Sequence, residues 1–171
     1  MGILNRLPVR SLLRFKCISK FWKALISDPY FKMKHLNRAK NDQDFQKLLI
    51  THWCRADDIV SLYYCPLSSV QLVENSQKLD IPANFKPTLC GILCCYNGLD
   101  VIEVTNTLGG GFTLLLWNPS IRESIVLSSL ELPYDEEYHF GLGYDSTSGD
   151  YKILHIYQNL GDSHLPNQIL A

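Results

Sequence analysis

The sequence predicts an α+β protein in which a small module of three helices, residues 1–40, precedes an all-β domain, residues 48–171. Two patterns predict this order: apolar residues recur at helical spacing in the first forty residues, and short runs rich in β-branched and aromatic residues follow. The polar stretch 41–47 is predicted to be a linker. Strand-turn-strand units at intervals of about 20 to 25 residues predict a propeller-like or a sandwich-like β domain.

The two predicted modules differ in charge. Residues 1–40 hold ten basic side chains and one acid, a net charge of +9, whereas residues 41–171 hold six bases and sixteen acids, a net charge of −10. This asymmetry indicates two modules with different partners. A basic helical module fits either an acidic protein surface or nucleic acid. The basic positions surround Leu and Phe on both sides and leave no separate charged face, which favours a protein partner.

The helical module is expected to begin anew at Pro8, because proline cannot continue a helix from the residues before it. Leu12, Phe15 and Trp22 then recur at helical intervals. Ser19 either interrupts this stretch or lies within it, and the sequence leaves both possibilities open.

Asp28-Pro29 is a strong signal for a helix start, with Asp as the N-cap and Pro in the first helical position. This helix is expected to extend from Tyr30 to about Arg38. Fewer than about 40 residues seldom form a stable fold without a disulfide, a metal or a partner. The module is therefore predicted to need a partner.

The β domain is predicted to consist of short strands and hairpins. The isolated strands are expected at 48–51, 59–64 and 70–73, and the hairpins at 91–95 with 99–104, 112–117 with 124–127, and 140–144 with 151–157. Asn97-Gly98 favours the positive φ angles of a tight hairpin turn. Because the chain ends soon after the third hairpin and would leave an open sheet edge, we expect the domain to be incomplete.

Composition narrows the class of protein. With 171 residues, an apolar fraction of 46% and a charged fraction of 19%, the chain is expected to be globular. No apolar run reaches the length of a membrane span, and no secretory signal or acceptor site for N-glycosylation is found. We therefore expect a cytoplasmic or nuclear protein with free thiols and no membrane partner.

Two sets of motifs resemble those of a known family. The first set is Leu7-Pro8-Val9, Ser11 to Cys17, Ser19-Lys20, Trp22 and Leu25 to Phe31. The second set is Asn97-Gly98-Leu99, Leu116 to Glu123, Gly141 to Ser146 and Asp150-Tyr151-Lys152. The first resembles the F-box of plant F-box proteins, and the second resembles their F-box-associated domain. Within this family the chain is most similar to the group containing the S-locus F-box proteins of pollen.

The resemblance implies a substrate-recognition subunit of an SCF-type ubiquitin ligase without catalytic residues, cofactor or metal of its own. Its F-box would bind the Skp-family adaptor, which binds a cullin and a RING subunit, and its β domain would hold the target protein. The residues implied in adaptor binding are Ile3, Leu4, Leu7, Pro8, Val9 and Leu12. For the S-locus branch, the family suggests secreted pistil ribonucleases (S-ribonucleases) as targets.

Other positions in the motif, namely Leu13, Phe15, Ile18 and Trp22, look like internal packing of the helices. Two departures from the family pattern stand out: only the last turn of the usual first helix precedes Leu7, and Asp100 replaces an apolar residue. A family member truncated at both ends, non-functional or retaining one binding surface, is therefore an alternative interpretation. A basic nucleic-acid-binding module is the alternative from a different class.

Signs of other chemistry are weak. Cys90, Cys94 and Cys95 do not match the spacing of a standard zinc site, so we expect them to pack as small apolar residues. The run Gly109-Gly110-Gly111 lacks the Lys and helix of a phosphate loop and is predicted to be a hairpin loop. Asp135-Glu136-Glu137 is predicted to be a solvated loop, and Trp117 a core residue.

Overall fold

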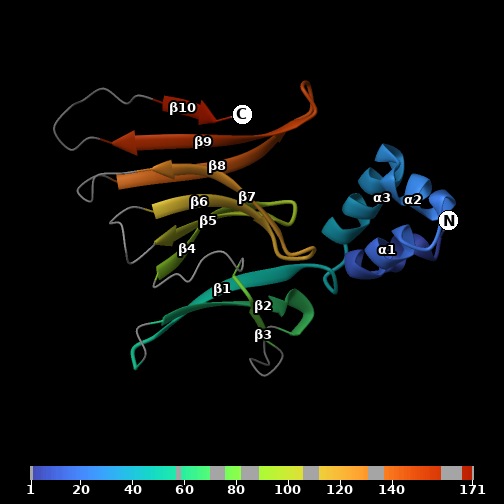
Figure 1. The fold of residues 1–171 in the computed structure, drawn as a ribbon, viewed down its shortest axis with the longest axis horizontal. Coiled ribbons are helices and arrows are strands. Elements are labelled where there is room, and N and C mark those ends of the chain that lie inside the picture. Colours follow the sequence, from blue (N-terminus) through green and yellow to red (C-terminus); the bar gives the residue numbers. More distant parts are fainter. Residues whose placement is uncertain are drawn as a thin grey trace. The chain divides into compact units, whose positions relative to one another are not determined.

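A computed structural model of the chain describes residues 2–56, 59–69, 76–81, 89–105, 112–130, 137–158 and 167–170. The chain divides into two compact units, residues 1–50 with 62–79 and residues 51–61 with 80–171. Helices come first and β-sheets follow, which confirms the α+β class (Figure 1). The domain boundaries at residues 40 and 48 stay a prediction.

The amino-terminal residues form short helices, as the apolar spacing predicts. The elements are the 3-10 helix η1 (Leu4–Arg6) and the α-helices α1 (Val9–Lys16), α2 (Lys20–Ser27) and α3 (Pro29–Lys40). A second 3-10 turn, η2 (Leu67–Ser69), follows later in the chain. Within the described residues, no helix is both long and apolar enough to cross a membrane.

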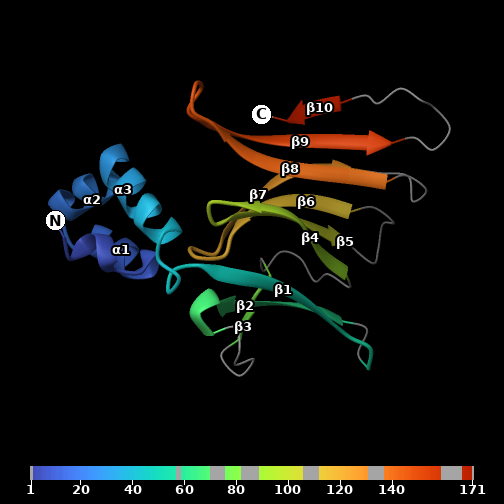
Figure 2. The same cartoon turned by 180° about the vertical axis from the view of Figure 1, so that it is seen from behind.

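Within the described residues, the strands form three sheets, each built from strands that follow one another in the chain (Figure 2). The first contains β1 (Lys47–Cys54), β2 (Ile59–Pro66) and β3 (Gln77–Leu79); the second β4 (Leu89–Tyr96), β5 (Leu99–Thr105), β6 (Phe112–Asn118) and β7 (Glu123–Leu130); the third β8 (Glu137–Asp145), β9 (Asp150–Gln158) and β10 (Asn167–Leu170). The strand pairs of the second and third sheets are antiparallel. Such sequential meanders are typical of propeller blades, whereas sandwiches of the Greek-key type need long connections between sheets.

The hairpin predicted at Asn97-Gly98 is confirmed. Asn97 has a φ of 56° and Gly98 a φ of 79°, so both central residues lie in the left-handed region that a two-residue hairpin turn requires. The turn fixes the register, in which Tyr96 pairs with Leu99 and Cys95 pairs with Asp100. A β-bulge between Ile92 and Cys94 then shifts the pairing.

The core of the four-stranded sheet is buried on both faces. Val101 and Ile102 are consecutive on β5, so their side chains point to opposite faces, yet both are fully buried. Trp117, on the neighbouring β6, is 1% exposed, which confirms its predicted place in the core. A sandwich leaves one face of each sheet in water, so burial on both faces favours the propeller-like alternative.

Two of the observed strands were not predicted from the sequence. The strands β3 and β10 were not predicted, because both are short and lack the alternating apolar pattern that identifies a strand. The strand predicted at 70–73, the glycine run 109–111 and the residues Asp135 and Glu136 lie outside the described residues.

Candidate functional site

The boundaries of the helices in the first module are fixed by two capping residues. Ser19 has an extended backbone, and its Oγ accepts a hydrogen bond from the Trp22 amide at 3.3 Å, so it separates α1 from α2. Asp28 caps α3, with its Oδ1 accepting from the Phe31 amide at 3.0 Å. The predicted start of this helix is thus confirmed, and the open question at Ser19 is resolved as two helices.

Three apolar side chains form the core of the helical module. Leu12 of α1, Ile26 of α2 and Phe31 of α3 are each buried. Leu4, Leu7, Phe15 and Trp22 are partly buried and pack around them. Because this core is small, residual apolar surface remains on the outside of the module.

The residues predicted to bind the adaptor lie on one continuous segment, η1 and the first turns of α1, but differ in exposure. Ile3 is 79% exposed and Pro8 is also exposed, while Leu4, Leu7 and Val9 are partly buried. Leu12 is different, because only 4% of its surface is exposed. The structure places Leu12 beneath the predicted docking surface, where it supports the neighbouring side chains from inside the core.

The four residues predicted to pack inside the module also differ in exposure. Phe15 and Trp22 do pack against the core, with ring centroids 5.8 Å apart. The expectation that Leu13 and Ile18 are internal is wrong: both are exposed, Ile18 to 66%. Ile18 is exposed because α1 ends at Lys16, so Ile18 lies in the turn before α2. Leu13 lies inside α1, one position past the buried Leu12, and consecutive residues of a helix do not share a face.

The turn at Leu7-Pro8 is held by α3. The Nε2 of His35 lies 2.9 Å from the carbonyl oxygen of Leu7. Since a carbonyl oxygen only accepts, His35 Nε2 must carry the proton in this bond. The His35 ring also stacks on Phe31, at 6.3 Å between centroids. This contact orients the segment that carries the predicted docking residues.

A hollow of about 390 Å³ lies beside the same segment. The residues lining it are Asn5, Phe21, Ala24, Leu25, Asp28, Tyr30, Phe31 and Lys34. Asn5 is 6% exposed, and its Oδ1 is buried without a hydrogen-bond partner among the described residues. Asn5 is not predictable from the sequence, because a single Asn in a short helical stretch is usually a surface residue and gives no signal of burial.

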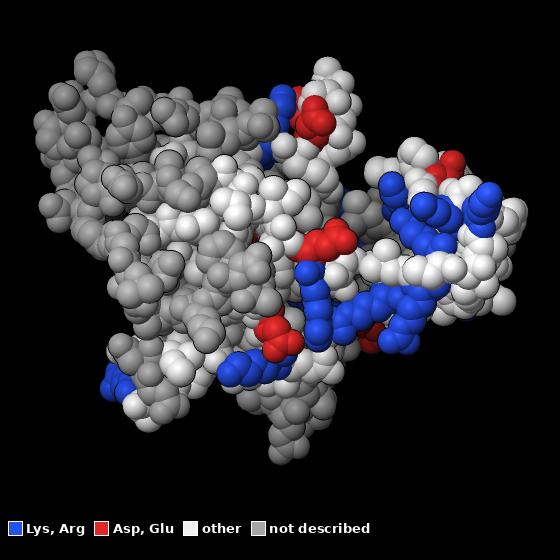
Figure 3. All heavy atoms as spheres, in the orientation of Figure 1, with Lys and Arg blue, Asp and Glu red and all other residues white. Residues whose placement is uncertain are grey.

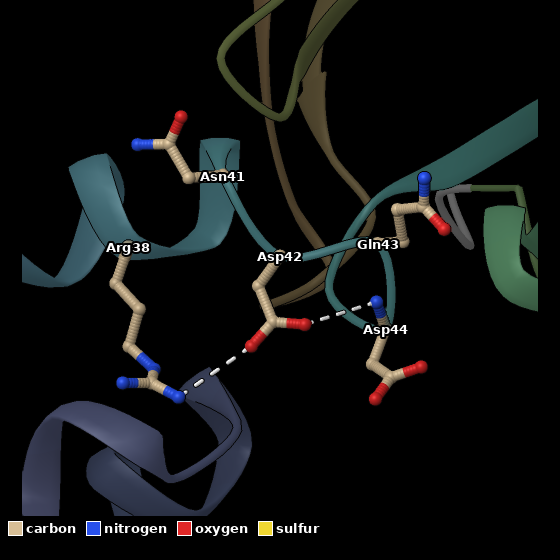
Figure 4. A pocket seen from close by; sticks show the side chains of 5 residues that line it. All are labelled: Arg38, Asn41, Asp42, Gln43 and Asp44. Carbon is tan, nitrogen blue, oxygen red and sulfur yellow. Dashed lines mark hydrogen bonds and ion pairs between the residues drawn. The ribbon is translucent and has the colours of Figure 1, made fainter.

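A second hollow, of about 530 Å³, lies at the end of α3 (Figure 4). It is lined by polar residues: Asp42 forms an ion pair with Arg38 at 3.5 Å, and its Oδ1 accepts from the Asp44 amide at 3.2 Å. These bonds organise the turn that ends the helix. They leave the charged groups of Arg38 and Asp42 satisfied by each other, so the arrangement is explained by local structure.

In the β domain, the thiols of Cys90 and Cys94 are poorly suited to bind metal or to act as nucleophiles. Burial raises the pKa of Cys90 to about 12 and that of Cys94 to about 11, so both remain protonated at neutral pH. The thiolate is the form that ligates metal and attacks substrates. Within the described part of the chain, no group of three or more His, Cys, Asp or Glu side chains is placed to hold a metal ion.

Asp100 is an unusual residue for its position. It lies on β5 opposite Trp117 in the register with β6, and it is buried. Burial raises its pKa to about 6. The carboxylate at an otherwise apolar position therefore opposes folding at neutral pH.

Replacing Asp100 by Asn is expected to stabilise the protein at pH 8 by about 2–3 kcal/mol, the equivalent of a pKa raised by about two units. The folded protein favours the protonated form of Asp100. The contribution of Asp100 to the free energy of unfolding is therefore fully present below the ordinary pKa of Asp, and it is lost as the pH rises through about 6. The variant and wild type should thus converge near pH 4. Urea unfolding at both pH values measures this, with the exposed Asp150→Asn as the control. Equal stability at pH 8 would contradict the prediction.

Comparison with known proteins agrees with the geometry of the helical module. Residues 2–34, which include η1, α1, α2 and most of α3, match the family model of the F-box domain. The structure thus defines an F-box followed by a β domain. No solved structure matches the chain.

The relatives come from Arabidopsis thaliana and match most of this chain. An F-box/kelch-repeat protein is 31% identical over 91% of this chain, and the F-box protein CPR1 is 32% identical over 95%. The match covers 43% of the first relative and 38% of the second, so the chain spans about two fifths of their length. The chain thus carries an F-box domain, and the relatives that it matches over most of its own length are plant F-box proteins. The finer assignment to the S-locus group stays a prediction.

Proposed function

We propose that this protein is a substrate-recognition subunit of an SCF-type ubiquitin ligase. The observation that carries the proposal is the F-box match at residues 2–34, folded as a compact module with apolar side chains left at its surface. Its docking residues lie on η1 and the start of α1, where His35 holds the turn at Leu7. The partner is the Skp-family adaptor, and through it a cullin and a RING subunit.

Apolar contact supplies most of the binding free energy in this proposal. Burying a Leu or Ile side chain contributes roughly 1.5–3 kcal/mol, and Ile3 offers nearly its whole side chain. Lys and Arg side chains gather over the same helices on the face shown in Figure 3. Their charge accelerates the encounter with an acidic partner more than it tightens the final complex.

The β domain is the part that would hold a target protein, and the ligase would act by proximity. Holding a target near the transferring enzyme raises its effective concentration and needs no reactive side chain in the receptor. We propose that a receptor of this kind acts in the cytoplasm or nucleus. An S-ribonuclease as target would follow only from membership of the S-locus group.

Binding to a purified plant Skp-family adaptor tests the proposal. The wild-type chain is expected to bind, and Ile3→Asp is expected to weaken binding at least tenfold, because it places a charge on an exposed apolar contact. Ile125→Asp, an equally drastic change at an exposed position on β7, is the control and should bind as wild type does. Isothermal titration calorimetry measures both.

A different result would favour the nucleic-acid alternative. If the chain ignores the adaptor and instead binds DNA or RNA with an affinity that falls steeply with salt, the receptor proposal fails. Contact with an apolar adaptor surface should change little between low and moderate salt.

A further inference from the structure

Three tyrosine side chains form a cluster where two sheets of the β domain meet. Tyr96 ends β4, beside the turn to β5, and Tyr144 and Tyr151 pair across the hairpin of β8 and β9. These two turns lie at the same end of the second and third sheets (Figure 1). The ring centroid of Tyr151 lies 6.5 Å from that of Tyr96 and 5.2 Å from that of Tyr144, so the three rings form one tyrosine surface.

The tyrosine surface is accessible to a partner. Tyr96 is 38% exposed and Tyr144 is 41% exposed, while Tyr151, between them, is partly buried. Exposed Tyr side chains are among the residues that contribute most to protein–protein binding, because they combine a large apolar ring with a polar tip. Contacts between the rings hold them in place before a partner arrives, so less conformational entropy is lost on binding.

The turn beside Tyr144 and Tyr151 carries a net negative charge. Asp145 follows Tyr144, Asp150 precedes Tyr151, and the register of β8 and β9 places the two acids directly opposite each other. Lys152 forms an ion pair with Asp145 at 2.5 Å, which offsets one of the two charges. Asp150 is exposed, so its carboxylate is accessible to an incoming group.

The same sign of charge prevails near Tyr96 and over the whole domain. Asp100 follows Leu99, the residue that pairs with Tyr96. Residues 41–171 contain sixteen acids and six bases, a net charge of −10. Such a charge attracts cationic partners and repels nucleic acid. Because the face of a Tyr ring also attracts a Lys or Arg cation, the rings and the carboxylates favour the same kind of partner.

We infer that the tyrosine surface binds a basic segment of the target protein, with an Arg or Lys side chain over the tyrosine rings and Asp150 as its counter-charge. The inference rests on the proposed function and names the chemical class of target that the proposed function leaves open. Two observations carry it: exposed rings that contact one another, and an exposed carboxylate at the same turn.

Titration of the full chain with an acetylated hexa-arginine peptide, followed by amide NMR, tests the inference. The amide signals of residues 94–100 and 143–152 should shift together, whereas hexaglutamine and hexaglutamate peptides should leave them unchanged. Shifts spread evenly over the acidic residues of the domain would indicate a general effect of charge and would overturn the inference. The absence of any shift with the hexa-arginine peptide would also overturn it.

The variant Tyr144→Leu tests the aromatic contact. It keeps an apolar side chain but removes the ring, so affinity for the hexa-arginine peptide should fall at least threefold. Tyr144→Phe keeps the face of the ring and should restore the affinity to within twofold of wild type. Tyr30→Leu, the same change at a tyrosine that is 72% exposed on α3, is the matched control. If Tyr144→Leu binds the peptide as tightly as Tyr30→Leu does, the rings do not contact the cation and the inference is wrong.

The variant Asp150→Asn tests the counter-charge. Its control is Glu123→Gln, which also removes one negative charge and lies at an exposed position on β7, separated from β4 by two strands of the same sheet. Asp150→Asn should weaken peptide binding about threefold more than Glu123→Gln at low salt, and this difference should shrink at high salt. Equal losses would show that the peptide responds to total charge alone, which contradicts the inference. Circular dichroism checks that each variant is folded.

The outcomes separate this inference from the proposed function. If the wild-type chain binds the adaptor but the hexa-arginine peptide does not bind at the tyrosine surface, the inference fails while the receptor role stands. If the peptide binds as expected but the chain ignores an adaptor that binds another plant F-box protein, the proposed function fails, and the assignment of the basic segment to a ligase target fails with it.

Discussion

Trp117→Ala is expected to destabilise the four-stranded sheet by about 3–5 kcal/mol, the largest loss we expect in the β domain. The side chain is 1% exposed and lies on β6 beside β5, whose residues Val101 and Ile102 are fully buried. Its removal leaves a cavity that the strands on either side can fill only partly. Since a domain of this size has about 5–15 kcal/mol of total stability, the change removes a large share.

Urea unfolding followed by circular dichroism measures the effect. Ile125→Ala, on the neighbouring β7, is the matched control, because Ile125 is mostly exposed and its truncation should change the free energy of unfolding by less than about 0.5 kcal/mol. If the two substitutions cost the same, Trp117 does not anchor this core.

Local signals in the sequence were sufficient for much of this fold. The caps at Ser19 and Asp28 and the turn at Asn97-Gly98 each depend on interactions within four residues, so their chemistry can be read from the sequence. The strands β3 and β10 depend on pairing with residues distant in the chain, with Gln77 paired to Tyr64 and Asn167 to Ile156. A short segment without an apolar pattern takes its structure from such a neighbour, and sequence patterns do not contain that information.

The candidate site also combines features that neighbouring residues determine with features that depend on residues distant in the chain. The segment from Ile3 to Val9 could be selected as a candidate docking surface because its motif is contiguous, and its binding role stays a prediction. The hollow could not, since it brings Asn5 together with Phe21 and Lys34, residues that only the packing of three helices places side by side. The motif resemblance assigned Ile18 to the interior, but α1 ends at Lys16 and α2 begins at Lys20, so Ile18 lies in the turn between them and is exposed.

Leu12→Ala is expected to cost the helical module about 2–5 kcal/mol, because Leu12 lies at the centre of its only core in the described residues. A module of about 40 residues has little stability to lose, so this cost should unfold much of it. Adaptor binding should then be lost through loss of structure. Hydrogen exchange resolves the effect by region: amides of α1, α2 and α3 should lose protection, while those of β5 and β6 should keep it.

Leu13→Ala is the matched control, because the adjacent residue is of the same type but exposed, and its truncation should leave protection in the helices unchanged. The comparison also decides between two roles for Leu12. If Leu12→Ala keeps full helical protection and still loses adaptor binding, Leu12 contacts the adaptor directly, as the motif predicts. Loss of protection together with loss of binding would instead assign it to the core, because a side chain with 4% of its surface exposed has almost no area to offer a partner until the helices move.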